Sequence, residues 1–197
     1  MVVGVLAFQG DVLEHHQALK NLGVESKDVR SIEEFRDVDA LIIPGGESTV
    51  IGKFLEETKL GEAIIDRTKK EKFPLYGTCA GAILLAKEIV GDSSVTSLKL
   101  IDISVERNAY GRQTESFQET ISLNLGSSTE EIVATFIRAP RIVRVGNTVE
   151  VLAMQNGDPV LCRQGSVLVS TFHPELLPEL SAVHQLFLES NSSGLHL

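Results

Sequence analysis

The chain has 197 residues, of which 43% are hydrophobic and 23% are charged, so it is long enough to bury a core. Its formal net charge of −9 argues against electrostatic binding to nucleic acid or to an anionic membrane surface. No apolar run approaches the roughly 20 residues that cross a bilayer. We therefore expect one domain over residues 1–197, with no nucleic-acid partner and no membrane partner.

The N-terminus and the cysteines bear on the cellular compartment. Met1 to Leu6 carry no basic residue before the apolar run, a pattern that predicts a strand rather than a signal peptide. The two cysteines are Cys79 and Cys162. Cys79 lies in a motif with its own chemistry, described below, so a structural disulfide is not expected. These features favour a cytoplasmic protein.

The first half of the chain alternates strand patterns with helical patterns. Strands are expected at residues 2–8, 24–29, 38–43 and directly before Cys79. Helices are expected at residues 12–22, 48–55 and 61–70, and again from Ala82 to Val90, with Ser48 as a cap. Strands that alternate with helices indicate βαβ units, hence a mostly parallel sheet with helices on both faces.

After Gly91 the sequence becomes rich in strand patterns. Strands are expected at residues 100–105, 117–123, 132–137, 149–154, 160–163 and 167–172. Asn156-Gly157 is a hairpin signal. A closing amphipathic helix is expected at residues 180–188, followed by a frayed tail at 191–194. The fold class is therefore α/β, with three layers, a mostly parallel central sheet and an added antiparallel portion.

Cys79 lies in the sequence Gly77-Thr78-Cys79-Ala80-Gly81, between a short apolar strand and an apolar helix. This is the thiol form of a nucleophile elbow, in which the two glycines allow a tight strand-to-helix turn. The helix N-terminus favours a thiolate there. The alternative is a cysteine buried as a small hydrophobic residue. The flanking glycines favour a nucleophile.

A base and its orienting partner are supplied by His173-Pro174-Glu175. Proline restricts the preceding His173 to extended backbone, where side chains two positions apart lie on one side. Glu175 can therefore reach the His173 imidazole and fix its tautomer. A strand-end histidine beside a solvated glutamate is the alternative. The combination with Cys79 favours the catalytic interpretation.

Loops after parallel strands meet at one edge of the sheet, where ligands bind. Three such loops are Gln9-Gly10, Gly45-Gly46-Glu47-Ser48 and Cys79-Ala80. The backbone amides of Gly45, Gly46 and Ala80 are candidates to stabilise an oxyanion. Alternatively, Pro44-Gly45-Gly46 is simply a strand-to-helix turn.

Three segments together resemble the signatures of class I glutamine amidotransferases, whose fold is flavodoxin-like: residues 44–49 (PGGEST), 77–81 (GTCAG) and 173–176 (HPEL). Residues 105–113 (VERNAYGRQ), 136–140 (FIRAP) and 6–11 (LAFQGD), with Glu14-His15, further resemble the glutaminase subunits of pyridoxal 5′-phosphate synthases. The resemblance covers residues 1 to about 188.

The resemblance implies hydrolysis of L-glutamine to L-glutamate and ammonia, without a cofactor or a metal. Cys79 would form a glutamyl thioester, His173 would transfer protons, and Glu175 would orient the imidazole. Glutamine would be contacted by Gly46, Glu47, Ser48, Arg107, Ile137 and Arg138. Guanidinium groups suit the α-carboxylate of glutamine. The residues leave open whether Arg107 and Arg138 act through side chain or backbone.

The resemblance also implies a partner, a (β/α)8-barrel synthase subunit that receives the ammonia for vitamin B6 biosynthesis in a hetero-oligomeric complex. Glutaminases of this type tend to have low activity alone. A hypothesis follows that docking completes the oxyanion hole near Gly45-Gly46 with help from Gln9-Gly10.

Other candidate residues have plainer interpretations. His15 and His16 lie on a predicted helix without a nearby ligand cluster, so metal binding is not expected. Cys162 is expected in the core and His184 on a helix surface. Arg112, Arg141 and Arg144 are expected to be solvated or ion-paired. No glycine pattern predicts nucleotide binding.

Three other functions remain open at this point: a glutaminase serving a different synthase, a cysteine-elbow redox sensor or deglycase, and a regulatory module without turnover. A histidine far from Cys79 would favour the redox or deglycase alternative.

Overall fold

The structure, a computed structural model, describes residues 1–91, 94–107, 116–126, 128–177 and 182–192. Its elements in chain order are β1 (Val2–Leu6), α1 (Val12–Asn21), β2 (Glu25–Val29), α2 (Ile32–Arg36), β3 (Ala40–Ile43), α3 (Ser48–Glu57), α4 (Leu60–Glu71), β4 (Leu75–Thr78), α5 (Ala80–Leu85), β5 (Ala86–Val90), β6 (Ile101–Glu106), β7 (Phe117–Asn124), β8 (Thr129–Phe136), β9 (Arg141–Val145), β10 (Glu150–Gln155), β11 (Asp158–Gln164), β12 (Val167–Ser170), the 3-10 helix η1 (Pro174–Leu176) and α6 (Ala182–Ser192).

A nine-stranded sheet in the order β2-β1-β3-β4-β12-β11-β10-β7-β8 forms the centre of the molecule. The strands from β2 to β12 in that order are parallel, and those from β12 to β8 are antiparallel to their neighbours. The strands β5, β6 and β9 form a second, smaller sheet. These findings confirm the predicted α/β class with an added antiparallel portion.

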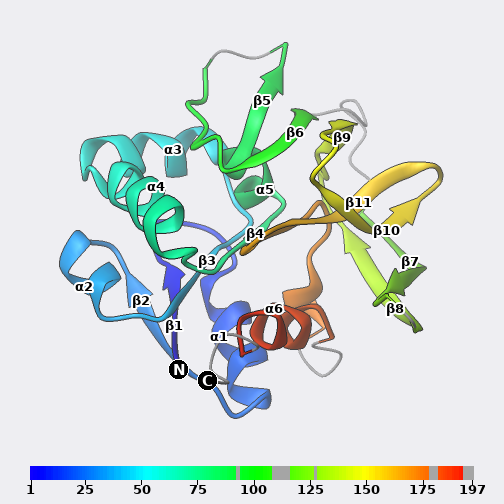
Figure 1. Cartoon of the computed structure of the whole chain (residues 1–197), viewed down its shortest axis with the longest axis horizontal. Coiled ribbons are helices and arrows are strands. Elements are labelled where there is room, and N and C mark those ends of the chain that lie inside the picture. The colour runs from blue at the N-terminus through cyan, green and yellow to red at the C-terminus, as the bar shows by residue number, and fades with distance from the viewer. Residues whose placement is uncertain (92–93, 108–115, 127, 178–181, 193–197) are drawn as a thin grey trace.

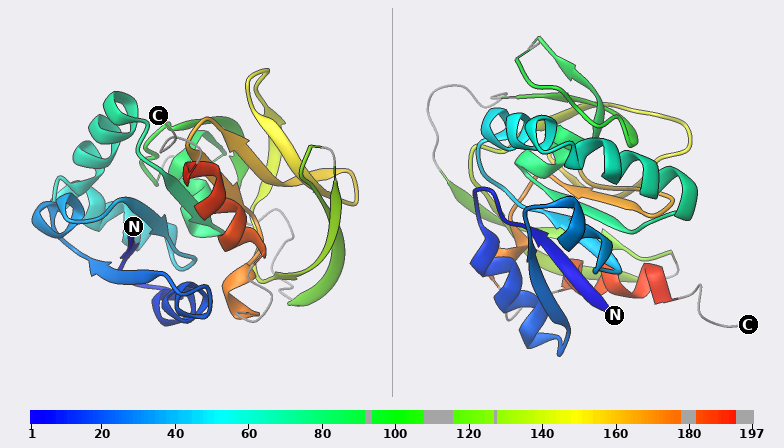
Figure 2. Two further views of the ribbon diagram at one scale, coloured as in Figure 1. Left: turned by 60° about the horizontal axis from the view of Figure 1, so that its bottom comes forward. Right: turned by 90° about the vertical axis from the view of Figure 1, so that its left-hand side faces the viewer.

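Helices cover both faces of the parallel half (Figure 1). Leu41 and Ile43 of β3 pack in a core with α2 to α5, whereas Ala40 and Ile42 pack in a second core with α1 and α6. Alternate residues of a strand point to opposite faces, so an all-apolar strand needs a cover on each side. The right-hand view of Figure 2 shows α3 and α4 on one side of the sheet and α1 and α6 on the other.

The expected helix from Ala82 to Val90 is wrong in its second half. The helix α5 ends at Leu85, and Ala86 begins the strand β5, which pairs in parallel with β6. Pairing with β6 therefore overrides the helical preference of Ala86, Lys87 and Glu88.

Three further elements have no counterpart in the sequence prediction: the short helix α2, the strand β9 and the 3-10 helix η1. The tail expected at residues 191–194 begins inside α6, which runs to Ser192; residues 193–194 lie outside the described part. The hairpin at Asn156-Gly157 is confirmed, because it joins β10 to β11 and both residues have positive φ. Within the described residues, no helix is both long and apolar enough to cross a membrane.

Candidate active site

Cys79 lies at the turn between β4 and α5 with a backbone φ of 48° and ψ of −99°. A non-glycine residue with positive φ is strained, and such strain concentrates at functional sites. A Cβ on Gly81 would overlap the Ile43 carbonyl oxygen, and one on Gly77 would lie 2.6 Å from the Gly81 carbonyl carbon. The elbow can therefore fold against β3 only because both positions are glycine.

His173 follows β12, the strand next to β4 in the sheet. Its backbone N–H donates to the Thr135 carbonyl oxygen at 2.8 Å, and the Cys79 N–H donates to the Ser170 oxygen at 2.8 Å. The Cys79 thiol lies close enough to the His173 ring to be among the groups that raise the pKa of His173. The structure thus brings Cys79 and His173 together from distant parts of the chain.

Glu175 contacts the Nδ1 nitrogen of the His173 ring. Its Oε1 lies 2.8 Å from His173 Nδ1, and its side chain is fully buried. Glu175 reaches the ring from the 3-10 helix η1, not from the extended backbone that the sequence suggested for both residues. The contact is present, but its backbone geometry differs from the expectation.

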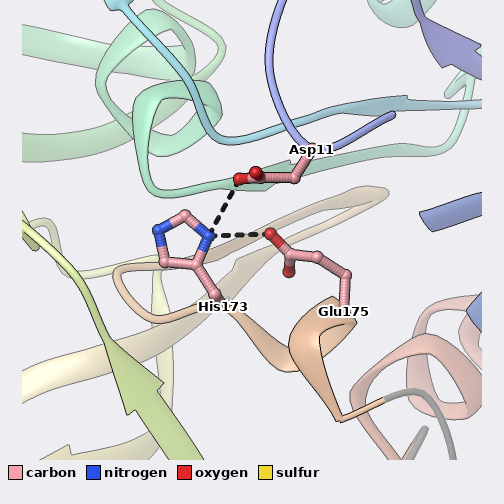
Figure 3. Close-up of side chains that lie close together, drawn as sticks. All are labelled: Asp11, His173 and Glu175. Atoms are coloured by element: carbon pink, nitrogen blue, oxygen red, sulfur yellow. Dashed lines mark hydrogen bonds and ion pairs between the residues drawn. The ribbon is translucent and has the colours of Figure 1, made fainter. Parts of the chain in front are cut away.

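Asp11, which was not predicted as a site residue, is a second carboxylate at His173. Its Oδ2 lies 3.2 Å from Nδ1, so this nitrogen faces both Asp11 and Glu175 (Figure 3). Asp11 follows β1 and lies at the same sheet edge. Its proximity to Gln9-Gly10 in the sequence was a signal that could have included it.

The carboxylates and the thiol decide the charge of His173. Burial opposes protonation most strongly, but hydrogen bonds with Asp11, Cys79 and Glu175 and the charge of Glu175 together raise the pKa of His173 to about 12. Burial raises the pKa of Glu175, opposed by its bond to His173. The proton shared between His173 and a carboxylate favours the imidazolium form of the ring.

The loop of Gly45 and Gly46 is anchored by the loop after β1. The Asp11 N–H donates to the Gly45 carbonyl oxygen at 3.2 Å, and the Glu47 N–H donates to Gln9 Oε1 at 2.7 Å. Gly45 also lies against His173, because a Cβ there would lie 2.5 Å from its Cε1. The Gly45-Gly46 loop, Gln9-Gly10 and the Cys79-Ala80 turn therefore meet at one edge, as the topology suggested.

The candidate glutamine-binding residues divide into two groups. Arg107 lies near the Gly45-Gly46 loop, where its Nη2 is 3.2 Å from Glu47 Oε1 and 3.3 Å from Thr49 Oγ1. Ile137 and Arg138 are exposed at the end of β8, and the Ile137 carbonyl oxygen lies 3.9 Å from Cys79 Sγ. Ile137 thus borders the elbow, whereas Arg107 adjoins the loop of Gly45 and Gly46 through Glu47.

Ser48 differs from its expected role as a helix cap. The residue that caps α3 is Glu47, whose side chain accepts from the Thr49 N–H at 3.3 Å. Ser48 is buried in the first turn of α3. The prediction was wrong by one residue because Glu47 also has a side chain that can accept this bond.

Several other expectations concern arginines and cysteines. Arg141 pairs with Asp158, and Arg144 pairs with Asp102, so both are ion-paired as expected. Arg112 and residues 108–113 of the quoted motif lie outside the described residues. Cys162 is fully buried, and burial raises its pKa to about 12, which confirms its place in the core.

His184 is not on the surface as expected. It is fully buried on α6, and its Nε2 lies 2.9 Å from Nδ1 of His15, which is also fully buried. Burial lowers the pKa of His184 to about 4. The prediction failed because the partner that satisfies this ring lies on a different helix.

Asp11, His173 and Glu175 have donor types and spacings that could hold a metal ion, since one donor atom of each lies within 4.8 Å of the others. The two carboxylates, however, both face the same ring nitrogen at hydrogen-bond distance. A cation there would have to displace the proton on Nδ1. We therefore assign this cluster as hydrogen bonds.

Comparison with known proteins places the chain among glutamine amidotransferases. Residues 5–193 match the model of the SNO glutamine amidotransferase family. The chain is 51% identical over 189 residues to the pyridoxal 5′-phosphate synthase subunit PdxT of a Thermus thermophilus strain, covering 95% of this chain and 96% of the relative. It is 50% identical to PdxT of Pseudothermotoga lettingae, covering 96% and 95%.

Solved structures agree with this placement. A crystal structure described as a glutamine amidotransferase superposes with a TM-score of 0.90 and 49% identity, covering 96% of this chain and 98% of that one. PurLQS from Thermotoga maritima superposes with a TM-score of 0.73 but only 17% identity, covering 95% and 97%. The second likeness concerns the fold alone.

Proposed function

The chain belongs to the SNO glutamine amidotransferase family, and on that premise we propose that it is the glutaminase subunit of a pyridoxal 5′-phosphate synthase. It hydrolyses L-glutamine to L-glutamate and ammonia. The observation that carries this function is the meeting of Cys79 with a His173 ring that is bonded to Glu175 on its far side.

We propose that the first half of the reaction uses Cys79 as nucleophile. The thiolate attacks the side-chain amide carbon of glutamine, and its sulfur forms the new bond as the carbonyl electrons move to oxygen. His173, held as imidazolium by the carboxylates behind it, then gives its proton to the leaving nitrogen. The C–N bond breaks, ammonia leaves, and a glutamyl thioester remains on Cys79.

In the second half, neutral His173 takes a proton from water, which attacks the thioester. The C–S bond breaks, glutamate leaves, and the thiolate and imidazolium are restored. Glu175 keeps the ring oriented through both halves. The amides of Gly45, Gly46 and Ala80 would stabilise the oxyanion, each worth on the order of 10²–10³ in rate.

The substrate would lie between the two groups of candidate residues around the elbow. Arg107 offers a guanidinium for the α-carboxylate, and Glu47 beside it offers a carboxylate for the α-amino group. Gly46, Ser48, Ile137 and Arg138 would complete the pocket. Because Glu47 already pairs with Arg107, the substrate would exchange one ion pair for two.

The ammonia would pass to a (β/α)8-barrel synthase subunit in a cytoplasmic hetero-oligomer. The Glu47 N–H is bonded to the Gln9 side chain in the isolated chain. Docking of the synthase against Gln9-Gly10 would change how the neighbouring Gly45-Gly46 amides are presented. Glutaminase rates that are equal with and without the synthase would refute this activation.

The alternatives are less well supported. A redox sensor or deglycase does not need a histidine at the thiol, whereas His173 lies beside Cys79 and its pKa is raised in part by that thiol. A glutaminase for another synthase is disfavoured by the 50–51% identity to PdxT, against 17% to PurLQS. A regulatory module without turnover would need no such arrangement.

The test is a glutaminase assay of the wild type and Cys79→Ala, each with the synthase subunit present. Release of ammonia by the wild type and its loss in the variant support the proposal. Pyridoxal phosphate formed from glutamine by the complex, and from added ammonia by the complex carrying the variant, identifies the synthase. Equal ammonia release by both proteins would exclude Cys79 as the nucleophile.

A further inference from the structure

Two fully buried histidines, His15 on α1 and His184 on α6, lie behind the acid of the candidate triad. His15 Nε2 is 3.7 Å from Glu175 Oε1 and 3.2 Å from Thr78 Oγ1. On its other side, His15 Nδ1 is 2.9 Å from His184 Nε2. A polar chain therefore runs from His184 through His15 to Glu175, and neither histidine has a part in the reaction described above.

Both rings are neutral, so each carries one N–H. Burial, then His184 and His173, lower the pKa of His15 well below its ordinary value, and burial lowers that of His184 to about 4. Two arrangements of protons are possible, because one ring must donate and the other accept across their 2.9 Å contact.

The outer ring nitrogen of His184, Nδ1, distinguishes the two arrangements. His184 Nδ1 has no hydrogen-bond partner among the described residues. If His15 donated to His184, the proton of His184 would lie on that nitrogen as a buried N–H without an acceptor, which is rare in proteins. If His184 donates from Nε2, only a lone pair is left unpaired, and the His15 proton lies on Nε2.

The second arrangement aims the His15 N–H at the triad. Its Nε2–H points to Thr78 Oγ1, with Glu175 Oε1 just beyond hydrogen-bond distance. Thr78 is the residue before Cys79 at the end of β4. The N–H dipole thus presents its positive end to Glu175 Oε1, the same oxygen that lies 2.8 Å from His173 Nδ1.

Among the other polar groups nearby, the backbone N–H of Glu175 also favours its ionised form, whereas the hydroxyls of Tyr76 and Ser170 donate elsewhere. Tyr76 packs edge-on against both histidines, and its hydroxyl lies 3.0 Å from Ser170 Oγ. Ser170 Oγ itself donates to the Phe172 carbonyl oxygen, so the Tyr76 hydroxyl donates to Ser170. Glu175 Oε2 has no partner among the described residues.

We propose that His184 and His15 form a positioning chain, both in the Nε2–H form, that directs an N–H at Thr78 and Glu175 and keeps this carboxylate ionised and aimed at His173. The role rests on the proposed glutaminase function. Burial, and to a lesser extent the charge of Asp11, raises the pKa of Glu175, so a fixed dipole beside it favours the charged form that His173 needs.

Two amide variants of His15 separate the proposed role from simple packing. In His15→Gln the amide nitrogen takes the place of Nε2 and can still donate toward Thr78 and Glu175. In His15→Asn the amide takes the place of Nδ1 and faces only His184. With the synthase subunit present, we expect His15→Asn to lower kcat about 10- to 100-fold, as for loss of a group that holds a catalytic residue from behind, with little change in KM.

His15→Gln should keep most of the wild-type kcat. His16→Gln is the matched control, because His16 is the next residue on α1 and bonds to Ser26 and Asp28 instead. It should behave as the wild type. Equal losses in His15→Gln and His15→Asn would reduce His15 to a packing residue and overturn the proposal.

A spectroscopic measurement tests the proposed proton arrangement of His15 and His184 independently of activity. Long-range proton–nitrogen correlation of the full chain, labelled with ¹⁵N-histidine, distinguishes the two neutral tautomers from imidazolium. We expect His15 and His184 both as Nε2–H tautomers, each assigned by correlating its ring with its own backbone in a wild-type sample labelled with ¹³C and ¹⁵N. An Nδ1–H form of either ring overturns the proposal, even if the amide variants fail to fold.

Ammonia release and the histidine tautomers, measured together, separate this proposal from the glutaminase function on which it rests. If the wild type with its synthase releases no ammonia, the glutaminase proposal fails while the tautomers remain measurable. If ammonia is released but either ring is Nδ1–H, only the positioning chain fails.

Discussion

His173 Nδ1 lies 3.2 Å from Asp11 Oδ2, although Asp11 follows the first strand of the chain and His173 follows the last. Both strands are parallel members of one sheet, with β3 and β4 between them. The same nitrogen is 2.8 Å from Glu175. The ring is therefore held by two carboxylates, one fully buried and the other about one-third exposed.

This contact predicts that Asp11→Asn lowers the pKa of His173. Asp11 supplies a hydrogen bond that raises that pKa, and a neutral amide favours the imidazolium less. A charge-assisted bond is worth about 1.5–3 kcal/mol, and partial exposure of Asp11 puts the change near the low end, about one pH unit. Because imidazolium is the acid, the alkaline loss of kcat should move to lower pH.

The measurement is the pH profile of kcat together with an NMR titration of His173. Asp28→Asn is the matched control, since Asp28 Oδ1 lies 2.9 Å from a different histidine, His16. An Asp11→Asn profile that coincides with that of the wild type would show that Glu175 alone sets the charge of the ring.

The two cysteines should behave in opposite ways. Cys79→Ala should lower glutaminase activity at least about 10³-fold with little effect on stability, because it removes the nucleophile. Cys162→Ala should keep activity but lower the free energy of unfolding by on the order of 1 kcal/mol, because it leaves a small cavity in the core. Ammonia release and urea unfolding measure the two effects, and activity lost equally in both variants would contradict the assignment.

The elbow should not tolerate a methyl group. Gly81→Ala would bring a Cβ into the Ile43 carbonyl oxygen, so we expect a loss of about 1–3 kcal/mol in stability and a displaced Cys79. Gly52→Ala is the control, because a Cβ there first meets the flexible end of Leu84 at 3.3 Å. Thermal unfolding and labelling of Cys79 by iodoacetamide report the outcome. Wild-type stability and labelling of Gly81→Ala would show that the turn can shift.

The parts of the site that could be predicted from sequence depend on neighbours along the chain. The glycines around Cys79 and the spacing of His173 and Glu175 are local patterns, and strand alternation locates them at one sheet edge. A capping box at Ser31 and Glu34 is another local pattern, and it marks the start of α2.

The parts that could not be predicted depend on which elements pack together. Asp11 reaches His173 only because β1 and β12 lie in one parallel sheet, and His184 is buried only because His15 on another helix satisfies its ring. A histidine on a predicted surface helix gives no sign of such a partner. The pairing of β5 with β6 likewise decides Ala86–Val90 against their helical preference.

The buried histidines predict instability in mild acid. Their folded-state pKa values are lowered, that of His184 to about 4, so their contribution to stability is present above the ordinary 6.5 and is lost as the pH falls toward 4. Each histidine adds up to about 1.4 kcal/mol per pH unit to this loss. Urea unfolding at pH 7, 6 and 5 should therefore give a shallower dependence for His184→Gln than for the wild type, whereas the partly exposed His16→Gln should match the wild type. Equal slopes in all three proteins would mean that the buried rings accept protons in the folded state.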